Sequence, residues 1–91
     1  MRVLVVEDDS RIATIIRRTL TENGYSVTVA STAPDGLEAF EVDVFDLVVL
    51  DLMLPGMPGG GMEVCRRIRL RNTGTPILML TALDSMRSKV A

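Results

Sequence analysis

Short apolar runs recur along the chain and predict four β-strands. The runs at residues 3–6 and 47–50 are uniformly apolar and rich in β-branched side chains, as is typical of strands covered on both faces. The run at 47–50 is the more uniform of the two and is expected at the centre of the sheet. At 25–30 apolar residues alternate with polar ones, which favours a strand nearer an edge. The fourth strand is expected at 75–82.

Between these runs, apolar residues recur at the spacing of amphipathic helices. The first helix is expected to begin at Ser10 and to end at Asn23 and Gly24. Its inward stripe is expected at Ile12, Ile15, Ile16 and Leu20. A shorter second helix follows a cap at Ser31 or Thr32. Its first turn contains Pro34, and its expected inward residues are Ala33, Leu37 and Phe40.

A third helix follows a loop that is rich in proline and glycine, at residues 55–61. Its predicted apolar stripe consists of Met62, Cys65 and Ile68. Four arginines lie beside this stripe, and we interpret them as a solvated helix face rather than a binding patch. A fourth helix is expected to start at Asp84 or Ser85.

Strands and helices therefore alternate along the whole chain and end in the start of a helix. This order predicts an α/β fold, an open parallel sheet with helices on both faces. Ninety-one residues allow one domain, which we expect to span residues 1–91. In such sheets, ligands bind beyond the carboxyl ends of the strands.

Composition and charge exclude several functions. Ten basic and twelve acidic residues give a net charge of -2 and a pI near 5.0, so we do not expect this chain to bind nucleic acid directly. The chain has no histidine and a single cysteine, which argues against serine-type hydrolases, zinc enzymes and an internal disulfide. No apolar stretch approaches the roughly 18 residues that would span a membrane, and the N-terminus does not read as a signal peptide. A cytoplasmic location is therefore expected.

Polar residues end three of the four predicted strands. Asp8 and Asp9 follow the first strand, Asp51 follows the third, and Thr81 ends the fourth. Crowded carboxylates favour a bound cation, and carboxylate oxygens suit Mg2+. Asp51 could act as a nucleophile that forms an aspartyl phosphate, while the Thr81 hydroxyl holds phosphoryl oxygens. Glu7 is expected to have a structural role, since strand alternation would turn its side chain away from that of Asp8.

Three segments together resemble the receiver domain of two-component response regulators: VLVVEDDSRI, VVLDLMLPGM and ILMLTA. The resemblance covers all 91 residues and implies a flavodoxin-like sheet with strand order 2-1-3-4-5. It implies that a sensor histidine kinase phosphorylates Asp51 and that Thr81 is the switch hydroxyl. It also implies that Mg2+ is bound by Asp8, Asp9 and Asp51 with the backbone carbonyl of Met53. The motifs are similar to those of receivers that precede a winged-helix DNA-binding domain, which implies an output in transcription.

The chain departs from the receiver pattern at its C-terminal end. Receivers continue into a fifth strand that ends in a phosphoryl-contacting lysine, and then into a fifth helix, whereas here the only lysine is Lys89 in the predicted fourth helix. The loop after Asp51 is also about two residues longer than in typical receivers. We therefore expect an incomplete receiver, truncated after the start of the fourth helix. Such a fragment is expected to form dimers or larger oligomers, by pairing along the edge of the fourth strand or by exchanging the fourth helix.

Two alternatives to a phosphoacceptor remain open from the sequence. The first is a non-catalytic interaction fragment, in which the loss of the family lysine impairs or abolishes phosphorylation. The second is a Mg2+-dependent phosphohydrolase with Asp51 as nucleophile. The second is disfavoured because such enzymes place another acid two residues after the nucleophile, where this chain has Met53.

Overall fold

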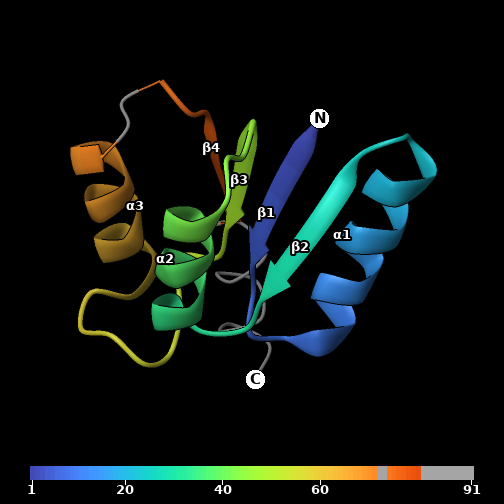
Figure 1. Ribbon diagram of the computed structural model, residues 1–91. Helices are drawn as coiled ribbons and strands as arrows, with labels where there is room; N and C mark the ends of the chain where they lie inside the picture. The colour runs from blue at the N-terminus through green and yellow to red at the C-terminus, as the bar shows by residue number, and fades with distance from the viewer. Residues whose placement is uncertain (72–73, 81–91) are drawn as a thin grey trace.

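The computed structural model describes residues 1–71 and 74–80 and shows a parallel sheet between helices (Figure 1). The elements in chain order are β1 (Arg2–Val6), α1 (Ser10–Glu22), β2 (Ser26–Ala30), α2 (Ala33–Val42), β3 (Leu47–Leu50), α3 (Gly60–Arg71) and β4 (Ile77–Met79). The predicted fourth helix and the end of the predicted fourth strand lie outside the described residues.

The four strands pair in the order β2-β1-β3-β4, and every pair is parallel. Val6 at the end of β1 pairs with Ala30 on one side and with Leu50 on the other. The carboxyl ends of β1, β2 and β3 therefore lie in one row. This arrangement confirms the predicted parallel sheet and the edge position of β2, and it brings the residues that follow β1 and β3 next to each other.

The core has two layers because alternate residues of each strand face opposite sides of the sheet. On one side, Leu4, Val48 and Leu50 pack with α2 and with Val64 and Ile68 of α3. On the other side, Val3, Val5 and Val49 pack with side chains of α1 and of the strands. The helices thus cover both faces, as the alternation of elements predicts (Figure 1).

The predicted inward stripes are correct for most positions and wrong at two. Ile15 is 65% exposed and Met62 is 60% exposed. Successive helix residues are rotated by about 100°, so a residue two positions from a buried one lies on nearly the opposite side of the helix. Ala13 marks the buried side of α1, and Ile15 lies two positions after it. Val64 marks the buried side of α3, and Met62 lies two positions before it.

The start of α2 agrees with the predicted cap. The Thr32 hydroxyl oxygen accepts a hydrogen bond from the backbone N–H of Asp35 at 3.2 Å, and Pro34 lies in the first turn. Gly36 lies directly against β1, because a Cβ at this position would come within 2.8 Å of the Val6 side chain. Among the described residues, no helix is both long enough and apolar enough to cross a membrane.

Candidate functional site

Three carboxylates converge where β1 and β3 end. Glu7 and Asp8 directly follow β1, and Asp51 directly follows β3. One carboxylate oxygen from each of the three lies within 4.8 Å of the others. Glu7 and Asp51 are fully buried whereas Asp8 is exposed, so the cluster opens to solvent on the side of Asp8.

The expectation that Glu7 turns away from Asp8 is wrong. It assumed that strand alternation continues through both residues, but β1 ends at Val6 and the chain turns into α1 directly afterwards. The backbone N–H of Glu7 donates to the carbonyl of Ala30 at 3.0 Å, and its Oε1 accepts from the backbone N–H of Asp9 at 3.0 Å. These bonds hold the Glu7 carboxylate beside the row of strand ends.

Asp9 has a different role from the predicted metal ligand. Its Oδ1 accepts hydrogen bonds from the backbone N–H groups of Arg11 at 2.9 Å and Ile12 at 3.3 Å. Asp9 is therefore the N-cap of α1, where an aspartate satisfies otherwise unpaired helix N–H groups. The sequence carried this signal, since Asp9 stands immediately before an amphipathic helix. In the described residues, the group that could hold a metal consists of Glu7, Asp8 and Asp51, without Asp9.

Backbone contacts on both sides fix the position of Asp51. Its N–H donates to the carbonyl of Val6 at 2.9 Å, which ties it to β1. Its Oδ1 accepts from the backbone N–H of Met53 at 3.1 Å, which orients the carboxylate. The Met53 side chain is exposed, and the predicted role of its carbonyl as a ligand stays a prediction.

Glycines at the start of α3 allow this helix to approach Asp51 closely. The N–H of Gly61 donates to the carbonyl of Leu52 at 2.8 Å. A Cβ on Gly61 would lie 2.7 Å from the Leu52 Cα and closer still to the Asp51 carbonyl oxygen. Gly60 has φ +53, in the left-handed region that favours glycine. The glycines of the unusually long loop therefore let α3 begin directly against the end of β3.

The donor set suits a hard divalent cation. Three carboxylates of like charge repel one another when they converge, and a bound cation would offset this repulsion. Oxygen ligands of this kind favour Mg2+, which keeps several of its waters and takes few protein ligands. The exposed Asp8 leaves room for those waters. Thr81, the predicted phosphoryl-binding hydroxyl, and Lys89 lie outside the described residues.

Comparison with protein families matches residues 3–91 to the response regulator receiver domain. The chain is 43% identical over 88 residues to the uncharacterized transcriptional regulatory protein YkoG of Bacillus subtilis, covering 97% of this chain and 38% of YkoG. It is 44% identical over 91 residues to the response regulator MprA of Mycobacterium avium, covering 100% of this chain and 39% of MprA. The chain thus spans well under half the length of these relatives.

Solved structures show the same fold. A chain in the structure of the histidine kinase ThkA in complex with the response regulator protein TrrA matches with a TM-score of 0.80 and 36% identity. The match covers 89% of this chain and 68% of the matched chain. TrrA of Thermotoga maritima in complex with Mg(2+)-BeF matches with a TM-score of 0.76 and 25% identity, over 98% of this chain and 95% of that one. The sheet, the acidic cluster and these likenesses agree, and the chain belongs to the receiver domains of two-component response regulators.

Proposed function

We propose that this chain is a phosphoacceptor in which Asp51 takes a phosphoryl group from a sensor histidine kinase in the presence of Mg2+. The observation that carries the proposal is the convergence of Glu7, Asp8 and Asp51 within 4.8 Å at the carboxyl end of the sheet. A buried nucleophile beside two further carboxylates requires a cation before a phosphate can approach.

Each residue of the cluster has a separate role in this proposal. Glu7, Asp8, Asp51 and the carbonyl of Met53 would hold Mg2+, which when bound supplies charge neutralisation for the incoming phosphoryl group. The hydrogen bond from the Met53 N–H to Oδ1 holds the Asp51 carboxylate in one orientation. A carboxylate oxygen of Asp51 attacks phosphorus, the bond from phosphorus to the donor breaks, and the leaving group departs with the bonding electrons. Thr81 is proposed to hold a phosphoryl oxygen.

The likenesses support the partners in this proposal. TrrA, which is similar to this chain, was solved in complex with a histidine kinase, and YkoG is described as a transcriptional regulatory protein. We propose a histidine kinase as the partner and transcription as the output. Because the chain spans only 38–39% of YkoG and MprA, we assign that output to a separate domain and not to nucleic-acid binding by these residues. A cytoplasmic location is part of the same proposal.

In this proposal the chain converts no metabolite, because it catalyses only the phosphorylation and dephosphorylation of its own Asp51. The alternative phosphohydrolase would need a second acid two residues after Asp51. That position is Met53, whose exposed thioether cannot act as a general acid or base. The non-catalytic interaction fragment differs from a phosphoacceptor in one property, the reactivity of Asp51.

Intact-mass spectrometry after incubation with acetyl phosphate and Mg2+ tests this proposal. We expect the gain of one phosphoryl group in the unaltered chain and none in Asp51→Asn. Asp8→Asn should lose most of the gain because it removes a cluster carboxylate, whereas Asp9→Asn should retain it, because asparagine also caps helices. No gain in a chain whose circular dichroism shows an intact fold would leave the non-catalytic interaction fragment as the function.

A further inference from the structure

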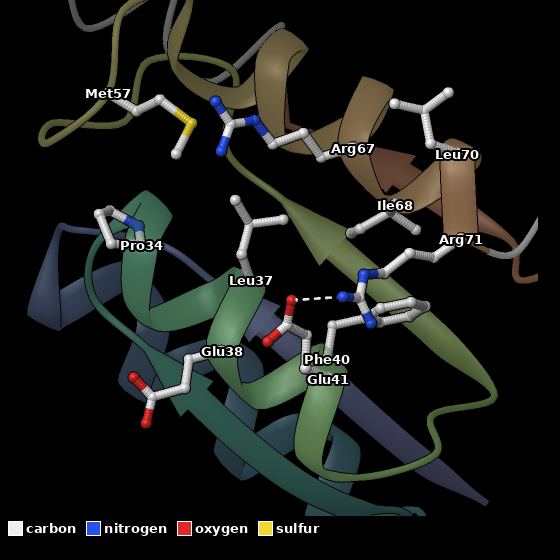
Figure 2. Close-up of a pocket in the computed structure, with 10 residues that line it drawn as sticks. All are labelled: Pro34, Leu37, Glu38, Phe40, Glu41, Met57, Arg67, Ile68, Leu70 and Arg71. Atoms are coloured by element: carbon white, nitrogen blue, oxygen red, sulfur yellow. Dashed lines mark ion pairs between the residues drawn. The ribbon is translucent and has the colours of Figure 1, made fainter.

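A groove of about 480 Å³ runs between α2 and α3 (Figure 2), and both helices lie on the face of the sheet opposite α1 (Figure 1). Leu37 and Phe40 of α2 and Ile68 of α3 supply its apolar lining, and Leu70 at its border is 73% exposed. Figure 2 shows charged side chains from both helices around this lining. We call the groove, together with the side chains of α2 and α3 that line it, the α2–α3 face.

The two helices of this face carry opposite charges. Three acids and no base occur in α2, namely Asp35, Glu38 and Glu41. Four arginines and one acid occur in α3, which leaves a formal charge of +3 against -3 for α2 (4 - 1 and 0 - 3). The arginines are Arg66, Arg67, Arg69 and Arg71. Of these charged residues, Glu38 and Glu41 line the groove on its α2 side and Arg67 and Arg71 line it on its α3 side, so the groove lies between an acidic wall and a basic wall of two side chains each.

Contacts within the chain engage all four arginines of α3, including Arg69, which donates to the Thr75 carbonyl, but they leave Glu38 and part of Arg67 facing solvent. One ion pair bridges the walls, between Arg71 Nη2 and Glu41 Oε1 at 2.8 Å. Glu63 at the start of α3 binds Arg66 and Arg67, and these guanidinium groups lower its pKa to about 2. The side chain of Arg67 nevertheless remains 51% exposed. Glu38 is exposed and forms no ion pair within residues 1–71 and 74–80.

We infer that the α2–α3 face docks a second copy of this chain about a two-fold axis. A surface with one acidic wall, one basic wall and an apolar strip between them is its own complement after a two-fold rotation, which places α2 of each copy against α3 of the other. Glu38 of each copy then faces Arg67 of its partner, so every such contact occurs twice. The apolar lining and Leu70 lose their exposure to water in the same step.

The geometry of this dimer is independent of phosphoryl transfer at Asp51. It also differs from the self-association that the sequence predicts along the edge of β4, where Leu78 is exposed and lies outside the α2–α3 face. Electrostatic attraction should stabilise the α2–α3 dimer but should not stabilise an association along the β4 edge. Because salt screens exposed charges over about 8 Å at physiological ionic strength, the α2–α3 dimer should weaken as salt rises.

Charge reversal and mixing test the inference by sedimentation velocity and native mass spectrometry. The unaltered chain should form dimers whose fraction rises with protein concentration and falls with salt. Glu38→Arg and Arg67→Glu should each dimerise at least 10-fold more weakly, since each places like charges in contact twice per dimer. An equimolar mixture of the two variants restores both attractive contacts and should give a dimer of mixed mass.

Circular dichroism melts of both variants establish that they are folded. Leu78→Lys serves as the matched control at the β4 edge and should dimerise like the unaltered chain. A monomer at high micromolar concentration would overturn the inference, as would charge-reversed variants that dimerise normally or a mixture that stays monomeric. Loss of the dimer in Leu78→Lys alone would assign the association to the β4 edge instead.

Discussion

Replacing Glu7 with glutamine removes one of three negative charges while retaining the shape of the side chain. The Asp9 N–H can still donate to Oε1 of the glutamine. Two unit charges at 4.8 Å, the upper limit of the separations within the cluster, repel by about 0.9 kcal/mol in bulk water and by about 3.5 kcal/mol at an effective dielectric constant of 20. Glu7 and Asp51 are buried whereas Asp8 is exposed, so the repulsion lies between these limits.

We therefore expect Glu7→Gln to raise the free energy of unfolding by about 1–3 kcal/mol when EDTA is present. For a domain of this size each kcal/mol raises the melting temperature by about 4–8 °C. Excess Mg2+ should cancel the advantage, because the ion binds the unaltered cluster more strongly and stabilises it by mass action.

Thermal melts of Glu7→Gln and Asp9→Asn, each with EDTA and with Mg2+, measure this effect. Asp9→Asn makes the same change in charge two residues away but leaves the metal-binding group intact, so its melting temperature should change little and its response to Mg2+ should match that of the unaltered chain. A lower stability of Glu7→Gln in EDTA, or an equal gain in Asp9→Asn, would refute the reasoning.

Further predictions concern the cap, the close approach of α3 and an exposed ion-pair group. Asp9→Ala should cost about 1 kcal/mol of stability in urea unfolding, because it removes the cap of α1, and Asp9→Ser should restore most of it. Gly61→Ala should destabilise the chain more than Gly24→Ala does in the same assay, because a Cβ at 61 would collide with the Asp51 and Leu52 backbone, whereas a Cβ at 24 meets nothing within 4 Å and adds only the strain of a φ of +88. Glu63 has a pKa lowered from 4.5 to about 2, chiefly by hydrogen bonds from Arg66 and then Arg67, so its contribution to stability is complete above pH 4.5 and is lost as the pH falls through 2. Acid titration of stability followed by circular dichroism should show this loss in the unaltered chain and not in Glu63→Gln.

Local pattern was sufficient to predict the alternation of strands and helices and the parallel sheet, whereas the order of the strands in the sheet was implied by the resemblance to receiver domains. Uniformly apolar runs such as Leu47–Leu50 have few alternatives to a buried parallel strand, and the observed β3 has these bounds. The predicted edge position of β2 also followed from its alternating pattern. Helix faces were harder to predict. Ile15 and Met62 are apolar but exposed, and only tertiary packing distinguishes them from the apolar residues that face the core.

The acidic site shows where sequence reasoning reaches its limit. Asp8 and Asp51 come together because both follow strand ends of a parallel sheet in which β1 and β3 are neighbours. Whether Glu7 or Asp9 joins them depends on the residue at which β1 stops and α1 is capped, and a shift of one residue would place Asp9 in the cluster instead of Glu7. The approach of Gly61 to the Leu52 backbone is likewise a contact between segments that no local pattern encodes.

Trapping the phosphorylated residue tests the central claim most directly. Borohydride reduces an aspartyl phosphate to homoserine, so peptide mapping after treatment with acetyl phosphate and Mg2+ identifies the acceptor. We predict homoserine at position 51 alone, and none when EDTA replaces Mg2+. Homoserine at another acidic residue, or an unmodified Asp51 in a folded chain, would contradict the assignment of Asp51 as the phosphoacceptor.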